Sequence, residues 1–205
     1  MNSAWMLPQL FLLPAFLAIL ILLFSSARVL LRLLAAGSVI SSLSGLVSAI
    51  WVLRRGVPVR AWGDWLMLDA LSAWHLAVMS AVFALSALYA LSYFGPEIES
   101  GKIGRPAARR LASLWLGSQA AMHLVLVSNN LGVMWVGIEA TTLLTAFLIC
   151  IHASPTSLEA MWKYLLMCSV GVALAFMGTL LLAAATQGAG IEGTQALLWT
   201  NLREN

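Results

Sequence analysis

The sequence has 205 residues, of which 61% are hydrophobic and 9% are charged, and its mean hydropathy is +0.93. An average soluble domain carries roughly 25% charged residues, so this composition excludes a water-soluble protein. The pI near 9.2 comes mainly from arginines in short polar gaps, which excludes a basic nucleic-acid surface. Cys150 and Cys168 both lie inside apolar runs. Their placement indicates buried side chains and excludes a disulfide framework and a soluble metalloenzyme.

Apolar runs long enough to cross a membrane follow one another along the chain. A bilayer core about 30 Å thick needs about 20 apolar residues per helix. The runs bounded by charged residues, Pro or Gly predict an all-α fold, a polytopic bundle of about six transmembrane helices. Their approximate limits are 5–24, 29–53, 66–94, 110–127, 131–151 and 158–185. Because no Lys or Arg precedes the first run, we expect a membrane helix there and not a cleaved signal peptide.

The polar segments between these runs divide the chain. We expect an amino-terminal three-helix region over 1–94, a polar loop over 95–109, three further helices over 110–186, and a polar tail or loop over 187–205. Only the Asn129–Asn130 pair separates the fourth and fifth runs, which predicts a tight antiparallel hairpin. Alternate gaps carry six and four basic residues, so the positive-inside rule favours an amino terminus outside the cell.

The strongest functional candidate is Glu139, inside the fifth run. It follows Asn130 by nine residues, which places it roughly 13 Å along the helix, close to the bilayer centre. An ionisable group at that depth costs several kcal/mol unless it is paired or hydrated. Trp135, Thr142 and Ala146 share its helix face. Two interpretations stay open: a protonated acid that hydrogen-bonds a neighbouring helix, with Thr142 or a backbone carbonyl as acceptor, or a carboxylate that carries protons.

The second candidate is Lys163, one turn inside the sixth run. Glu159 precedes it by four residues, the spacing of a helical ion pair, so a pair that anchors the helix at the membrane surface is one interpretation. Lys163 also shares a stripe with Gly171 and Gly178, where a neighbouring helix can approach closely, and this favours a lysine that faces protein. Lys163 lies roughly 6 Å and Glu139 roughly 20 Å from the inner edge of the membrane. We therefore expect Glu139 to reach a partner through water or outside this sequence.

Other polar residues within the runs favour structural roles. Asp69 opens the third run, where the helix dipole stabilises a carboxylate. Gln119 and His123 lie one turn apart in the fourth run; His123 is a candidate proton relay, although an interhelical hydrogen bond is the commoner role. The sequence contains no GxGxxG, P-loop, CxxC, HExxH or Ser-His-Asp pattern. We therefore expect no residue for covalent catalysis, no cofactor and no metal in this chain.

Two stretches of the sequence indicate a family. The runs VLVSNNLGVMWVGIEATTLLTAFL (125–148) and SLEAMWKYLLMCSVGVALAFMGTLL (157–181) resemble the antiporter-like membrane subunits of respiratory complex I and membrane-bound hydrogenases. IEATTL and LEAMWKY are most similar to the component F group of hydrogenase 4 and formate hydrogenlyase. LDALSAW (68–74) and ALYALSYF (87–94) fit the third span of that family.

The resemblance implies a proton-translocating subunit with about fourteen helices in inverted repeats, of which these residues form the first part. Glu139 would correspond to the family's buried glutamate and Lys163 to the lysine of the next span, with Glu159 at the entry or coupling point and His123 as a relay. In the family, that glutamate pairs with a lysine, and further lysines and a histidine on later helices continue the path. Iron–sulfur, nickel–iron or flavin centres would belong to partner subunits of a complex in a prokaryotic inner membrane.

Two other classes of function stay open from the sequence. A cation/proton antiporter or ion-coupled transporter subunit would show sodium-dependent transport without a redox partner. A non-catalytic scaffold would use Glu139 and Lys163 only to hold helices together, and their neutral substitution would then leave transport unchanged.

Overall fold

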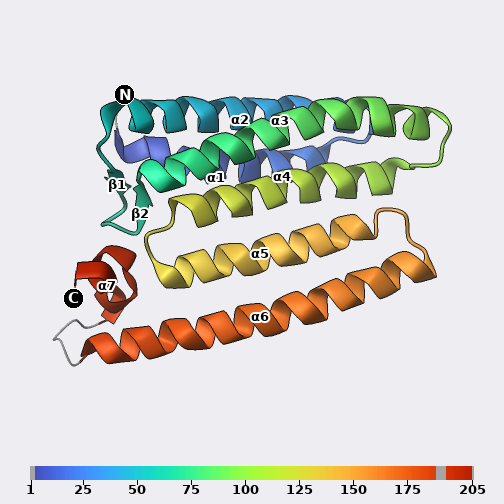
Figure 1. Ribbon diagram of the computed structural model, residues 1–205. Helices are drawn as coiled ribbons and strands as arrows, with labels where there is room; N and C mark the ends of the chain where they lie inside the picture. Colours follow the sequence, from blue (N-terminus) through green and yellow to red (C-terminus); the bar gives the residue numbers. More distant parts are fainter. Residues whose placement is uncertain (1–2, 188–192, 205) are drawn as a thin grey trace.

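The structure is a computed structural model that describes residues 3–187 and 193–204. Long helices run side by side in alternating directions, and a short helix follows them (Figure 1). The helices are α1 (Ser3–Leu20), α2 (Ala27–Arg55), α3 (Ala70–Glu99), α4 (Arg105–Val127), α5 (Leu131–Ile149), α6 (Pro155–Gln187) and α7 (Trp199–Glu204). The smaller elements are the 3-10 helices η1 (Ile21–Leu23) and η2 (Gly193–Leu197) and the strands β1 (Val59–Ala61) and β2 (Leu66–Leu68).

The helical membrane fold predicted from the sequence is confirmed, with one change in the number of spans. Among the described residues, 5 helices are long and apolar enough to cross a membrane, whereas the sequence predicted six. The exception is α4, which carries three arginines in its first turns and the polar Gln119 and His123 farther along. It packs against α1, α2, α3 and α5, so its polar side chains can face protein. Its hydropathy is lower because it lies inside the bundle.

Two buried apolar clusters hold α1 to α4 together. One gathers Leu7, Leu10, Val52 and Leu76 near the β-hairpin, and Val127 of α4 joins it. The other lies at the opposite end of the bundle, where α1, α2, α3 and α4 meet. Because lipid is as apolar as these side chains, the clusters stabilise the four-helix region through close van der Waals packing.

The polar segment after α2 forms a β-hairpin. Gly56 ends α2 in the left-handed conformation (φ 64°), and its N–H donates to Val52 O at 2.9 Å. β1 and β2 pair antiparallel, with Val59 opposite Leu68. The third run was predicted to be helical from residue 66, but its first residues are a strand and α3 begins only at Ala70. Leu66 and Leu68 are buried and Met67 between them is less so, which is the period-two pattern of a strand and not that of a helix.

The two polar segments predicted over 95–109 and 187–205 both contain more helix than expected. The loop predicted over 95–109 is shorter, because α3 continues through Pro96 to Glu99 and α4 begins at Arg105. The tail predicted over 187–205 contains η2 and α7, and residues 188–192 and 205 of it lie outside the described residues. The tail returns to the α4–α5 junction, since Trp199 N donates to Asn129 O at 2.8 Å.

Candidate functional site

The junction between α4 and α5 sets the position of Glu139. The side-chain oxygen of Asn130 accepts hydrogen bonds from Gly132 N at 2.9 Å and Val133 N at 3.1 Å, which caps α5. The tight hairpin predicted at Asn129–Asn130 is thus present. Nine residues of helix from this cap place Glu139 about 13 Å along α5.

The Glu139 side chain is half-buried and lacks a hydrogen-bonding partner on one oxygen. Its Oε2 is inaccessible to solvent and makes no hydrogen bond within the described part of the chain. A buried carboxyl oxygen without a partner costs free energy, because it has lost water and gained nothing in exchange. The oxygen therefore keeps an unused hydrogen-bonding capacity, which a proton can fill without added space.

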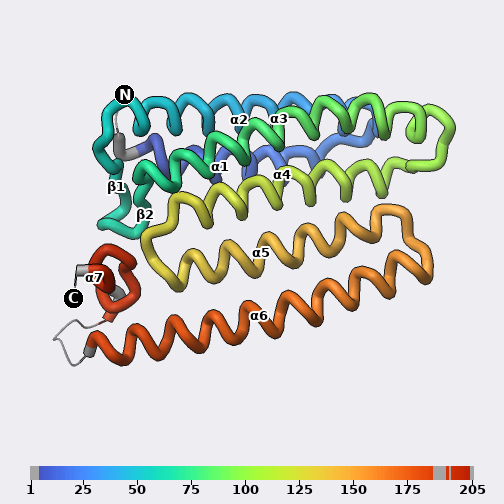
Figure 2. Tube along the Cα trace, viewed as in Figure 1, coloured from blue at the N-terminus to red at the C-terminus, as the bar shows by residue number. Residues whose placement is uncertain are grey.

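Two contacts fix the register of α6 against α5, which lie side by side in Figure 2. Trp135 Nε1 donates to Val172 O at 3.2 Å, and Thr145 Oγ1 lies 3.0 Å from Tyr164 Oη. Glu139 lies between Trp135 and Thr145 along α5. Glu139 therefore lies beside the segment of α6 between Tyr164 and Val172.

The threonines near Glu139 bond to their own helix. Thr141 Oγ1 donates to Gly137 O at 2.9 Å, and Thr142 Oγ1 donates to Ile138 O at 3.1 Å. A hydroxyl that bonds one turn back satisfies its donor locally. In the described residues no hydrogen bond joins Thr142 to Glu139, so the bond to this threonine that the sequence suggested is not formed.

The structure keeps Lys163 away from Glu139. The Lys163 ammonium pairs with Glu159, and their side chains are 71% and 64% exposed. Gly171 and Gly178 share the same open side of α6, where a Cβ would meet nothing within 4 Å. The stripe that favoured a close helix neighbour thus faces away from α5, and no described element covers it.

Gln119 and His123 tie helices together in the four-helix region. The Gln119 amide donates to Ser42 Oγ at 3.0 Å and accepts from Ser38 Oγ at 2.9 Å, which joins α4 to α2. The fully buried His123 lies with Nδ1 2.8 Å from Leu10 O, which joins α4 to α1.

His123 is also turned away from α5. The face of α4 that meets Gly137 of α5 carries Ala121 and Val125. His123 lies between these two in sequence, so it is on the opposite side of the helix. The structure therefore does not bring His123 and Glu139 together. Asp69 lies at the start of α3, where its Oδ1 accepts from Ser72 N at 2.8 Å.

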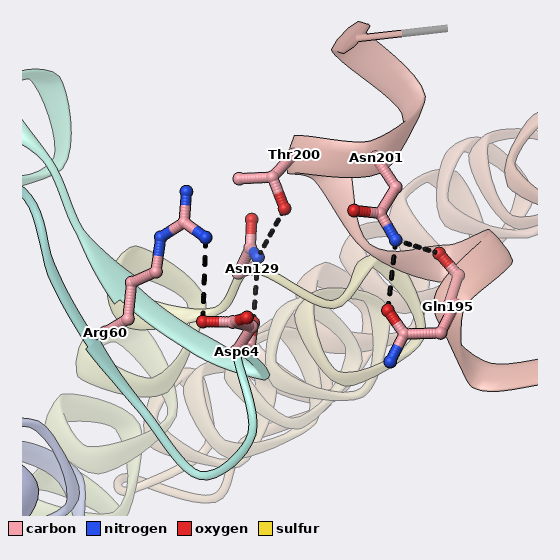
Figure 3. Close-up of polar contacts among 6 residues, drawn as sticks. All are labelled: Arg60, Asp64, Asn129, Gln195, Thr200 and Asn201. Atoms are coloured by element: carbon pink, nitrogen blue, oxygen red, sulfur yellow. Dashed lines mark hydrogen bonds and ion pairs between the residues drawn. The ribbon is translucent and has the colours of Figure 1, made fainter.

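Sequence reasoning missed two groups of polar residues. The buried serines of α2 form a stripe at helical spacing, and this spacing in SVISSLSGLVS was the signal available: Ser38, Ser41, Ser42 and Ser48. Asn129 was interpreted only as a turn residue. Its Nδ2 donates to Asp64 O at 2.8 Å and to Thr200 Oγ1 at 3.1 Å, which joins the β-hairpin, the α4–α5 junction and α7 (Figure 3).

Comparison with solved structures shows the fold. The chain superposes on a chain of the membrane-bound sulfane sulfur reductase, an archaeal respiratory membrane complex, with a TM-score of 0.67 and 21% sequence identity. The match covers 90% of this chain and 37% of that chain. Over the matched residues the chain therefore has the same helical fold as that chain.

Comparison with curated proteins gives a sequence relationship. No known family model matches the chain. A hydrogenase-4 component F homolog from Methylacidiphilum infernorum (isolate V4) is 36% identical over 140 residues, which are 68% of this chain. The match spans 29% of that relative's length. Over these residues the chain is similar to that component F homolog, which confirms the resemblance identified from its sequence.

Proposed function

We propose that this chain forms part of a membrane subunit of a hydrogenase-like or respiratory complex, and that Glu139 carries protons in it. The homology and the fold support the first part of this proposal. The observation that carries the second part is the buried Oε2 of Glu139, which has no partner among the described residues. It lies about 13 Å from the cap of α5, where neither membrane surface supplies bulk water.

A carboxyl group in this position can alternate between two states. In its neutral form the group carries a proton, and in its ionised form it attracts a cationic group. Lys163 is paired with Glu159 and faces the other side of α6, so the cation would come from outside α1 to α6, across the open side of the described bundle.

The Lys163–Glu159 pair would serve at the entry or coupling point of this path. It lies in the first turns of α6, near the same end of the bundle as the start of α4, where basic residues are most numerous. By the positive-inside rule this end would face the cytoplasm, with the amino terminus outside a prokaryotic inner membrane. His123 is left out of the proposed path because it faces α1. Electron transfer and its iron–sulfur, nickel–iron or flavin centres would belong to partner subunits.

The test is Glu139→Gln in the complete complex, which keeps the shape of the side chain and removes its proton chemistry. Loss of a positioned proton-transfer group costs about a hundredfold or more in rate, so we expect proton translocation to fall below detection while electron transfer and assembly persist. The measurement is acidification by inverted membrane vesicles. Glu99→Gln, at the exposed end of α3, is the matched control and should translocate protons normally.

The alternatives give different results in the same experiment. Undiminished translocation in Glu139→Gln would contradict the assignment and leave a scaffold role. Transport that follows the sodium gradient and persists without a redox partner would indicate a cation/proton antiporter.

A further inference from the structure

The turn between α1 and α2 forms an open pocket with the ends of α3 and α4. Its volume is about 500 Å³. The lining combines hydroxyl, guanidinium and aliphatic groups: Ser25, Ser26, Ala27, Arg28, Ile98 and Arg105. Arg109 holds the turn in place, because its Nη2 donates to Phe24 O at 3.0 Å. The pocket is thus built from segments that are far apart in the sequence.

The pocket carries two positive charges, on Arg28 and Arg105. In the described part of the chain, neither arginine takes part in an ion pair. Of the acids at this end, Glu97 lies 3.3 Å from His152, Glu159 pairs with Lys163, and the exposed Glu99 forms no ion pair with the described residues of the pocket. Two unpaired guanidinium groups in one concavity favour an anion, and the planar guanidinium matches phosphate oxygens with two hydrogen bonds at a time.

The backbone around the turn adds hydrogen-bond donors. Ser26 is the N-cap residue of α2, and its side chain makes no capping hydrogen bond. The first N–H groups of α2 and the hydroxyls of Ser25 and Ser26 are therefore available beside the arginines.

The pocket lies at a membrane surface. The turn separates two candidate spans, Trp5–Leu23 and Ala27–Arg55. Directly before it, Leu22, Leu23 and Phe24 expose apolar side chains, with Leu23 78% exposed. A ligand here would therefore meet cationic donors at one end and hydrocarbon-facing residues next to them.

We propose that this pocket binds the phosphate of an anionic phospholipid, with the acyl chains lying against the exposed end of α1. Basic pockets between helices at the membrane surface are suited to such headgroups. The amphiphilic surroundings favour a lipid over a free phosphate ion. This site is separate from Glu139 and does not depend on the proposed proton chemistry.

The experiment compares two double variants of the intact protein in nanodiscs of phosphatidylcholine with about 10% phosphatidylglycerol. Arg28→Gln with Arg105→Gln removes two charges from the pocket. Lys102→Gln with Arg110→Gln removes two charges from the same end, at residues that do not line the pocket. Native mass spectrometry of the released protein counts retained phosphatidylglycerol. We expect about tenfold lower retention for the pocket variant and little change for the control.

Two further measurements distinguish a lipid from a free phosphate ion and test whether the variants are folded. Arg28→Lys with Arg105→Lys keeps the charge and should retain more lipid than the glutamine variant. Inorganic phosphate in excess should not displace the lipid. Equal loss in both glutamine variants, no loss in either, or displacement by inorganic phosphate would each overturn the proposal.

Discussion

The four-helix region and the α5–α6 pair differ in how much of their surface is buried and in the polar groups that they leave without a partner. In the most apolar window of α2, 50% of the residues are buried inside the described structure, whereas in that of α6 none are (0%). In the four-helix region Ser38 and Gln119 bond across helices. Other buried polar atoms there have no hydrogen-bond partner in the described part of the chain: Ser41 Oγ, Ser80 Oγ, Arg109 Nε and His123 Nε2. In the α5–α6 pair, Glu139 keeps a buried oxygen without a partner.

The difference in burial separates a region whose helices cover one another from a pair whose outer helix is open. Helices that bury one another gain packing contacts within the region itself. A buried carboxyl group and an uncovered helix face are instead typical of a surface where another element docks. The α4–α5 interface is the boundary between the two regions.

The largest effect on this boundary should come from Gly137→Ala. A Cβ at residue 137 would lie 2.7 Å from Val125 Cγ2 and 3.4 Å from Ala121 O. Valine has one strongly preferred χ1 rotamer in a helix, so Val125 cannot easily turn away. We expect the free energy of unfolding to fall by about 1–3 kcal/mol, measured by titration with sodium dodecyl sulfate in mixed micelles.

Gly117→Ala is the control for this prediction. It lies on α4 and faces α5, but its Cβ would meet only the flexible end of Leu144, at 3.4 Å. Its unfolding free energy should change little. If both variants lose the same stability, the close approach at Gly137 is not what joins the two regions.

A smaller effect is expected from Gln119→Leu within the four-helix region. The substitution removes the bonds to Ser38 and Ser42 and leaves the Ser38 hydroxyl without its acceptor. Interhelical hydrogen bonds in membrane proteins average about 0.6 kcal/mol each, so the same titration should show a loss of about 1–2 kcal/mol. Thr145→Val removes one interhelical contact, with Tyr164, besides the bonds of the Thr145 hydroxyl within its own helix, and should cost less. If Gln119→Leu and Thr145→Val lose the same unfolding free energy, hydrogen bonds between helices contribute equally in the two regions, which would contradict this prediction.

The sequence predicted the elements whose signal is local. Length and hydropathy located the long helices, and the chain turn at Asn129–Asn130 followed from two residues. Hydropathy also marked Glu139, because a carboxylate inside an apolar run is conspicuous. These features depend on neighbours in the sequence, and no tertiary contact is needed to see them.

Features that depend on tertiary contacts could not be predicted. Each strand of the β-hairpin has only three residues. Leu66, the first residue of β2, also pairs with Ser128, which follows α4 and lies far away in the sequence. Because α4 lies inside the bundle, it can carry polar residues within an otherwise apolar run. Hydropathy alone cannot distinguish a helix inside a bundle from one at its surface. The direction in which Lys163 points likewise follows from where α5 lies and not from its spacing to Glu159.

The smallest effect is expected on the open side of α6. At Gly171 a Cβ would meet nothing within 4 Å, so the substitution Gly171→Ala adds no clash and removes the helix penalty of glycine. In the 205-residue chain, the unfolding free energy should rise by about 0.5–1 kcal/mol. Gly178→Ala, on the same stripe, should behave in the same way.

The same two substitutions in the complete complex reverse this expectation if another helix lies on the stripe. Glycines one or two turns apart allow close helix contact, and each added methyl group would then separate the helices. Reduced assembly there, with unchanged or higher stability of the isolated chain, would identify the open side of α6 as a face on which another helix docks. Equal behaviour in both settings would show that this side faces lipid.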